Sequence, residues 1–254
     1  MTATVSAELG TPAWSRRLTG YLVTPAVLVA VLLALYLYVR SQTLDSIEER
    51  RINVAFIGQA TVEHIRLTVV STALVLLVAI PVGILLTRPF ASRITAPAVA
   101  VFNIGQAVPS IGLLVLFAIV WGVGFWPAVV ALVAYSALPV LRNTMIGLTQ
   151  VDAAVIESGR GMGMSKLGVL TRIELPLSVP VILTGLRTAL VINVGTAAIG
   201  ALTNAGGLGG LIVAGLTTNR QLVTVVGSVL IAVLALTVDY LGRVAEDVLR
   251  PNGL

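Results

Sequence analysis

The segment ESGRGMGMSKLGVLTRIELP, residues 157–176, is polar and rich in glycine, yet it lies between long apolar stretches. Asp152 and Ser165 each precede a short helical pattern. Side-chain oxygens at such positions accept hydrogen bonds from the free backbone N–H groups of a first helical turn. The glycines at 159, 161 and 163 are expected to break the helix between them. The segment therefore predicts two short helices joined by a glycine turn, around which the rest of the chain is arranged.

The second of these short helices is predicted to be amphipathic. Its apolar residues recur every three positions and its polar residues fall between them. The apolar positions are Leu167, Leu170 and Ile173, and the polar positions are Lys166, Arg172 and Glu174. Pro176 lacks a backbone N–H, so we expect it to end this helix and to start the next apolar run.

The composition is that of an integral membrane protein. Of the 254 residues, 57% are hydrophobic and only 11% charged, and the mean hydropathy is +1.01. Soluble domains carry about 25% charged residues. The net charge of +5 comes from basic residues that are all arginine except Lys166 and lie mostly beside apolar runs. Membrane orientation explains them better than a nucleic-acid surface does.

The apolar runs predict an all-α protein with about six transmembrane helices. They cover residues 21–39, 67–87, 94–123, 126–148, 176–202 and 222–241. The run 94–123 would be about 45 Å long as a helix, against a hydrocarbon core of about 30 Å. The loops at Arg88 and at Glu157 are both rich in arginine and hence cytoplasmic, so the chain crosses the membrane an even number of times between them. The run 126–148 supplies one crossing, and the run 94–123 therefore supplies the other, as a broken helix that bends at Pro109.

Both termini are then cytoplasmic, with Arg16 and Arg17 inside and a first span that is retained rather than cleaved as a signal peptide. Residues 40–66 form a polar external loop with balanced charge, in which residues 44–52 are either a short interfacial helix or plain loop. After residue 202, the glycine-rich segment 204–210 and a short apolar piece are expected to re-enter the membrane without crossing it.

The residues at 157–176 resemble the EAA loop of bacterial ABC importer permeases. That pattern is E-A-A, three residues, G, nine residues and I-x-L-P, and Glu157, Gly163, Ile173, Leu175 and Pro176 match it in spacing. Ser158-Gly159 replaces the two alanines, which should weaken the first helix by about 1 kcal/mol. In that family the loop is cytoplasmic and docks on the ATPase subunit. The resemblance assigns docking here to Glu157, Ser158, Gly159, Gly163, Met164, Ser165 and Lys166.

Longer stretches, among them NIGQAVPSIGLLVL, ALPVLRNTMIGL and ELPLSVPVILTGLRTALV, are similar to permeases of glycine betaine, carnitine and choline importers. The resemblance implies a five-helix permease core at 65–245 with a coupling loop at 152–176, preceded by an N-terminal unit at 1–64 and followed by a tail at 246–254. It implies residence in the bacterial inner membrane. The implied partners are ABC ATPase subunits, a second identical or related permease, an extracellular binding protein and membrane lipid.

The sequence offers little chemistry of its own. Lys166 follows serine, so the nucleotide-binding loop G-x-x-x-x-G-K-[ST] is absent and ATP hydrolysis is assigned to another chain. There is no cysteine, and His64, the only histidine, is expected to be a solvated loop residue, so we predict no metal site, cofactor or catalytic residue. An osmotically gated channel that works without ATP is the main alternative, and a membrane-embedded enzyme is a weaker one.

Polar residues inside the predicted spans are candidates to line a translocation path or to bond neighbouring helices. They are Asn103, Gln106, Ser110, Asn193 and Thr196. Arg187 is expected to lie within the membrane, where a charge is costly and normally paired. Asp239, near the inner end of the last span, is its predicted partner. Arg142 is expected to extend to the cytoplasmic interface.

Overall fold

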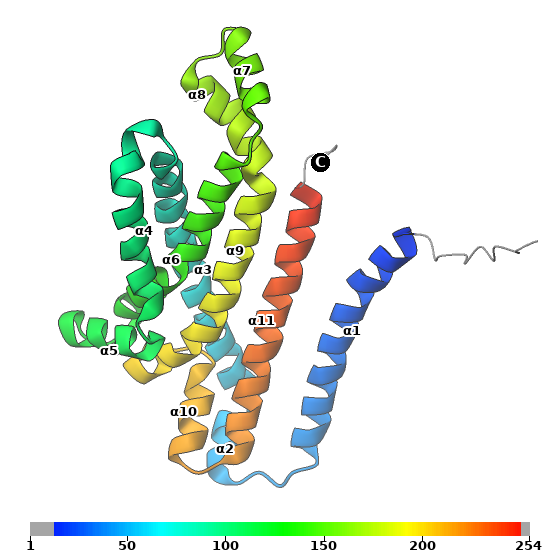
Figure 1. Cartoon of the computed structure of the whole chain (residues 1–254). Helices are drawn as coiled ribbons and strands as arrows, with labels where there is room; N and C mark the ends of the chain where they lie inside the picture. Colours follow the sequence, from blue (N-terminus) through cyan, green and yellow to red (C-terminus); the bar gives the residue numbers. More distant parts are fainter. Residues whose placement is uncertain (1–12, 250–254) are drawn as a thin grey trace, which may run out of the picture.

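The computed structural model describes residues 13–249, with side chains from residue 21 onward, and this part of the chain is a helical bundle without strands (Figure 1). Arg16, Arg17 and Arg250, and hence their predicted orientation, lie outside the described side chains. The helices are α1 (Ala13–Arg40), α2 (Ser46–Arg51), α3 (Val54–Leu86), η1 (Pro89–Ala91), α4 (Ser92–Ala107), α5 (Ser110–Trp121), α6 (Phe125–Thr149), α7 (Ala153–Gly161), α8 (Lys166–Val169), η2 (Leu170–Glu174), α9 (Leu175–Ala197), η3 (Ala198–Thr203), α10 (Gly209–Thr217) and α11 (Gln221–Leu249).

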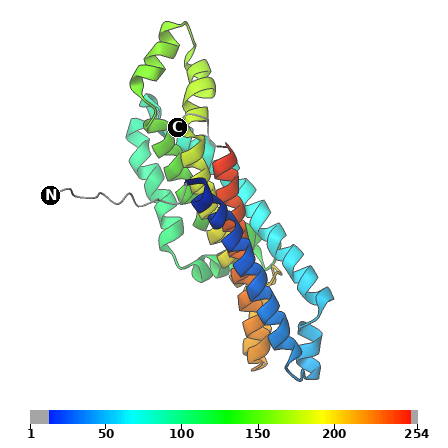
Figure 2. The ribbon, with the colours of Figure 1, turned by 90° about the vertical axis from the view of Figure 1, so that its right-hand side faces the viewer.

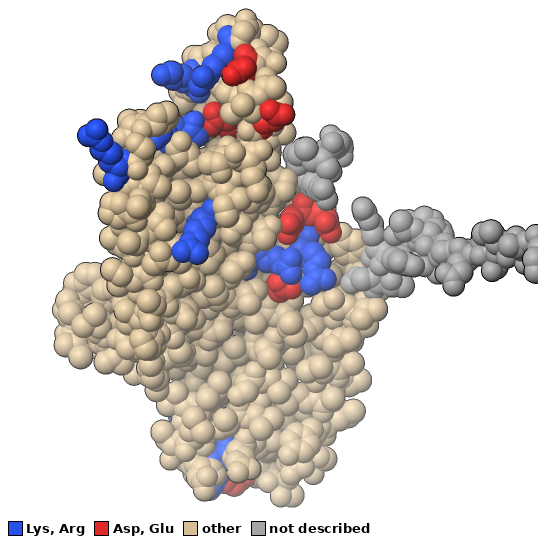
Figure 3. Space-filling view, in the orientation of Figure 1, with Lys and Arg blue, Asp and Glu red and all other residues tan. Residues whose placement is uncertain are grey.

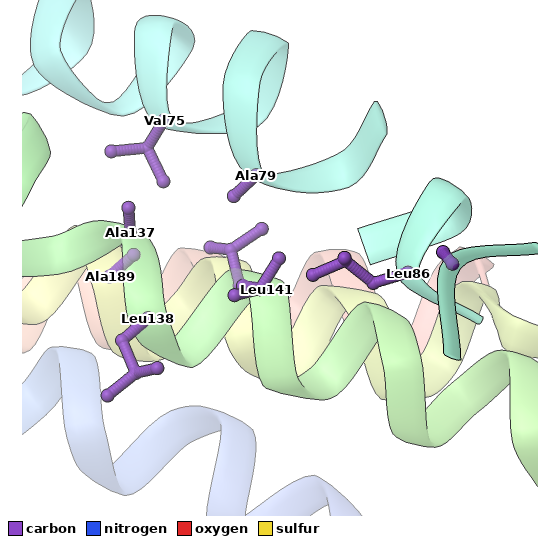
Figure 4. Close-up of a cluster of buried hydrophobic side chains, with 9 residues drawn as sticks. Val75, Ala79, Leu86, Ala137, Leu138, Leu141 and Ala189 are labelled. Atoms are coloured by element: carbon purple, nitrogen blue, oxygen red, sulfur yellow. The ribbon is translucent and has the colours of Figure 1, made fainter. Parts of the chain in front are cut away.

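The centre of the bundle is the contact of α3, α6 and α9. Figure 4 shows Val75 and Ala79 of α3 facing Ala137 and Leu141 of α6, and Ala189 of α9 lies beside them, all nearly inaccessible to solvent. Small side chains allow the helix backbones to approach closely, as is common in membranes.

Gly185 shows how close this approach is. A Cβ added there would lie 2.9 Å from the Pro139 carbonyl oxygen and 2.7 Å from the Asn143 Cβ. Only glycine therefore allows α9 to pack against α6 at this distance.

The prediction of about six spans is confirmed. Among residues 13–249, five helices are long and apolar enough to cross a membrane, and counting the bent pair made by η1–α4 and α5 raises the number to six. The two parts of that pair meet at 97° across Val108 and Pro109, as the sequence predicts. In Figure 1, α5 leaves the bundle sideways instead of continuing the direction of α4.

The second span is longer than predicted. α3 has 33 residues, or about 50 Å, and begins at Val54 instead of near residue 67. The loop prediction was wrong for residues 54–66: they belong to α3, and Glu63 bonds to the backbone N–H of Gly207 instead of facing solvent.

Of the two alternatives for residues 44–52, the structure contains the short helix, α2. Asp45 caps α2 through a capping box with Glu48 and also binds Arg220 at the start of α11 at 2.6 Å.

His64 is buried rather than solvated, so its prediction was wrong. It lies on α3 with no exposed surface, and its Nε2 is 2.9 Å from the Val194 carbonyl oxygen of α9. The glycine-rich loop before α10 packs directly onto it, because a Cβ on Gly207 would lie 3.1 Å from His64 Nδ1. The neighbouring Glu63 accepts the Gly207 N–H at 3.0 Å. These contacts attach the glycine-rich loop to α3.

Pro176 does not end a helix, contrary to the prediction. The chain runs from α8 through the π turn η2 into α9, and residues 166–203 form one continuous helical span. Pro176 lies in the first turn of α9. At the turn before it, the Leu175 N–H bonds to the Leu170 carbonyl, five residues back. Such a widened turn accommodates residues that an α-helix interior excludes.

α1 lies at the edge of the bundle, beside α11 (Figure 2). The Tyr240 hydroxyl donates to the Tyr21 carbonyl at 3.1 Å, and the Tyr21 hydroxyl donates to Asp247. Most of α1 is exposed, with Leu28 its buried residue among those described. The beginning of α1 and the end of α11 lie toward the same end of the molecule as α7 and α8 (Figure 1).

Candidate functional site

The coupling loop, residues 152–176, projects from one end of the bundle (Figure 1). Asp152 accepts the Ala154 N–H at 2.8 Å and begins α7, and Ser165 accepts the Gly168 N–H at 3.1 Å and begins α8. Both predicted caps are therefore present. Between the helices, Gly163 has φ +85°, a conformation that is unfavourable for residues with a Cβ.

The glycine prediction was only partly right. Gly159 and Gly161 lie inside α7, and the turn depends on Gly163 alone. Gly159 is buried against the second helix, where an added Cβ would lie 2.5 Å from Ile173 Cδ1. Gly159 therefore packs α7 onto η2, and its assignment as a docking residue stays a prediction.

The outer surface of the coupling loop combines exposed apolar and basic side chains. Val155 is 42% exposed, Leu167 68% and Met162 73%. Of the predicted apolar stripe, Leu170 and Ile173 are half-buried whereas Leu167 is exposed, and Val169 beside them is buried. Figure 3 shows charged side chains gathered on this end and on the half of the molecule next to it.

The other predicted docking residues are accessible to different degrees. Met164 is half-buried, and the following are exposed: Glu157, Ser158, Gly163, Ser165 and Lys166.

The polar residues of the spans separate into two groups. Asn193 is fully buried, and its Nδ2 donates to Thr72 Oγ1 at 2.9 Å, so it joins α9 to α3 and does not lie on an open surface. The other group is half-buried and consists of Asn103, Gln106, Ser110 and Thr196.

In the second group, Asn103 on α4 has a basic partner. Its Oδ1 accepts from Arg142 Nη2 of α6 at 2.8 Å. Arg142 was expected to extend to the cytoplasmic interface, but in the structure it is bonded across to α4.

Arg187 and Asp239 lie in direct contact. Arg187 Nε and Nη2 donate to the two oxygens of Asp239 at 2.5 and 3.0 Å, joining α9 to α11. Arg243 lies 3.2 Å from Asp239, and Glu246 lies 3.8 Å from Arg187. The charges therefore form a small network. Near it, Glu246 and Asp247 help to line a hollow of about 560 Å³ between α6, α9 and α11.

Sequence reasoning missed a second ion pair. Arg88 Nη2, just after α3, donates to Glu174 Oε2 of the coupling loop at 2.6 Å, and Glu174 is 5% exposed. The available signal was Glu174 itself, because a carboxylate so close to an apolar span is expected to be paired. Its partner, Arg88, lies 86 positions earlier, and no local sequence feature indicates the pairing.

Comparison with known protein families identifies the chain. Residues 79–251 match the family described as "Binding-protein-dependent transport system inner membrane component". The chain belongs to this family. It is therefore a permease, a multi-pass transmembrane subunit of an ABC importer in the inner membrane. α1 and α2 precede the matched residues.

Curated relatives of the permease are about as long as it is. The osmoprotectant import permease protein OsmY of Salmonella typhimurium is 38% identical over 213 residues, which cover 84% of this chain and 89% of OsmY. The choline transport system permease protein OpuBB of Bacillus subtilis is 39% identical, with 76% and 88% covered. The glycine betaine/carnitine/choline permease OpuCB of B. subtilis is 36% identical, with the same coverage.

Solved structures agree in fold. The MetNI methionine ABC transporter in an inward-facing conformation contains a chain that matches with a TM-score of 0.70 and 24% identity, over 82% of the permease and 100% of that chain. An amino acid ABC transporter crystallised with histidines gives a TM-score of 0.65 at 17% identity, over 81% and 99% of the chains. The predicted fold class, an all-α ABC importer permease, is thereby confirmed.

Proposed function

We propose that the permease imports osmoprotectants of the quaternary amine class, such as choline, carnitine or glycine betaine, with energy from ATP. The observation that carries this proposal is its similarity to OsmY, OpuBB and OpuCB, whose names state osmoprotectant, choline and glycine betaine/carnitine/choline transport. The permease has few aromatic residues, at 5%. Recognition of a quaternary ammonium by aromatic rings therefore belongs to a separate extracellular binding protein.

The coupling loop is proposed to dock on a separate ATPase subunit. Two observations support this: the loop projects from the bundle, and it exposes Val155, Met162 and Leu167 beside Arg160 and Lys166. The end that carries the loop is then cytoplasmic, and the beginning of α1 and the end of α11, which lie toward the same end, are cytoplasmic too. The five-helix core at 65–245 corresponds to the transporting unit, with its first helix, α3, beginning earlier, at Val54, and α1 and α2 are additions that precede it.

ATP binding and hydrolysis would then move the coupling loop. Because α8, η2 and α9 are continuous, a displacement of α8 reaches the middle of the bundle without an intervening flexible link. Asn103, Gln106, Ser110 and Thr196 are proposed to line the path, at and near the bend between α4 and α5. A second permease subunit is proposed to complete that path, because these side chains are half-buried on a single helical bundle.

The test is solute accumulation in cells with and without the gene, using radiolabelled choline, carnitine and glycine betaine. We expect accumulation of at least one solute that depends on the gene and disappears when the ATPase subunit is inactivated. If no labelled solute accumulates in a gene-dependent way, the proposed substrate class is wrong. Uptake that persists without ATP hydrolysis would instead support the osmotically gated channel.

A further inference from the structure

Arg88 fixes the corner between α3 and α4. Its Nε donates to the Ile84 carbonyl at 3.2 Å, and its Nη2 reaches Glu174 at 2.6 Å, so the guanidinium bridges α3 and the coupling loop. The corner is also held by Thr95 of α4, whose hydroxyl lies 3.0 Å from the Leu86 carbonyl and 2.9 Å from the Ala91 carbonyl. The end of α3 and the start of α4 therefore form one connected unit.

Glu174 is held equally firmly on its own side. It is the last residue of the π turn, and its carbonyl accepts the Ser178 hydroxyl at 2.6 Å. Ser178 packs against α6, where a Cβ added at Gly147 would lie 3.1 Å from the Ser178 Cβ. The carboxylate of Glu174 is therefore attached to a fixed point of the backbone, where the coupling loop continues into α9.

The Arg88–Glu174 pair is also distinctive in what it connects. The main contacts of α7 and α8 are with each other and with η2. Among the described residues, this is the one ion pair that joins residues 152–176 to a part of the bundle outside α9. A carboxylate with 7% of its side chain exposed would be poorly solvated without its partner.

We propose that Arg88 and Glu174 are positioning residues for transport, through which the coupling loop moves the α3–α4 corner together with α9. Movement of the loop then displaces two parts of the bundle: α9 directly, and α4 through the ion pair. The displacement of α4 reaches the bend between α4 and α5, where Asn103, Gln106 and Ser110 lie. This inference rests on the proposed function, because it concerns how ATP-driven motion reaches the path.

The test uses the complete transporter, with its ATPase and binding protein, reconstituted in liposomes. Phosphate release and uptake of radiolabelled choline and glycine betaine are measured together. For Arg88→Gln and for Glu174→Gln we expect uptake per ATP to fall about tenfold, the range of a typical coupling between two sites, while hydrolysis stays within about twofold. The charge swap Arg88→Glu with Glu174→Arg is expected to recover most of the ratio.

Arg93→Gln is the matched control. Arg93 lies on α4 five positions from Arg88, is exposed and forms no ion pair among the described residues. Its replacement removes the same charge and should leave uptake per ATP unchanged. Thermal unfolding of each purified variant separates loss of folded protein from loss of coupling, and Arg88→Lys, which keeps the charge, provides a folded variant with an intermediate expected ratio.

The outcomes separate the two proposals. A wild-type ratio in Arg88→Gln and Glu174→Gln overturns the positioning role alone, as does a charge swap no better than the single variants. A wild-type complex that hydrolyses ATP but takes up neither choline nor glycine betaine is then tested with carnitine, and uptake of none of the three overturns the proposed substrate class and the inference that rests on it.

Discussion

The ion pair between Arg187 and Asp239 can be tested by its contribution to stability. The two side chains are 28% and 24% exposed and share two hydrogen bonds. Exposed pairs contribute about 0.2–1 kcal/mol, whereas disrupting a buried pair costs about 3–5 kcal/mol. This pair lies between those limits, so we expect Arg187→Met or Asp239→Asn to lower the free energy of unfolding by about 2 kcal/mol.

The neighbouring charges reduce the loss in each single variant. Without Arg187, Asp239 still has Arg243 at 3.2 Å, and without Asp239, Arg187 still has Glu246 at 3.8 Å. Either single variant has already lost the pair, so the second replacement, which gives the double variant, should cost less than the same replacement in the wild type. We expect a coupling energy of about 1–2 kcal/mol, within the range found for residues in contact.

Thermal unfolding of the wild type and the three variants in one detergent measures this coupling. A loss of about 2 kcal/mol corresponds to a fall in Tm of about 4–8 °C for a chain of this size. Arg243→Gln is the control, because removal of an exposed i,i+4 pair should cost less than about 0.5 kcal/mol. If the losses from Arg187→Met and Asp239→Asn add within about 0.5 kcal/mol, the two residues do not act as a pair and the reasoning is wrong.

Three further predictions follow from single positions. Gly163→Trp should place a side chain at φ +85° and uncouple ATP hydrolysis from uptake, and full coupled transport in liposomes would contradict the role of this turn. Gly185→Leu should prevent packing of α9 on α6 and reduce the yield of folded protein, measured by size-exclusion chromatography. Gly210→Leu is the control, because the space around Gly210 is open and the yield should not fall. The backbone N–H of Glu48 and the side chain of Arg220 hold the pKa of Asp45 below its ordinary value of 3.8, against partial desolvation. Its stabilisation is therefore complete above that value and is lost as pH falls through the lower folded pKa, so Asp45→Asn should lower Tm at pH 7 and have a progressively smaller effect as the pH falls below 3.8.

The sequence predicted features that depend on short-range chemistry. Asp152 and Ser165 were recognised as caps because a cap needs only its own side chain and the next few N–H groups. The bend at Pro109 follows from the missing N–H of proline and from a run too long for one straight crossing. The spacing from Glu157 to Pro176 indicated the permease family because a motif of fixed spacing can be read from one sequence, whereas the packing of the whole fold cannot.

The errors arose where a distant partner decides the conformation. Glu63 and His64 are typical of a loop in the sequence, but Glu63 bonds to the Gly207 N–H and His64 Nε2 bonds to the Val194 carbonyl within the bundle. Pro176 was read as a helix end, but the π turn before it absorbs the change. Arg88 has no local feature that predicts its pairing with Glu174. Contacts of this kind depend on the packing of spans and are not visible in a single sequence.

The unbroken helical span from Lys166 to Thr203 has a mechanical consequence. Its 38 residues run without a break through α8, η2, α9 and η3, and α9 alone is about 35 Å long. A displacement at α8 is therefore passed along the helix toward its far end. That far end bears the loop that Glu63 and His64 hold to α3. Force applied on one side of the membrane would thus be felt on the other by a single stiff element.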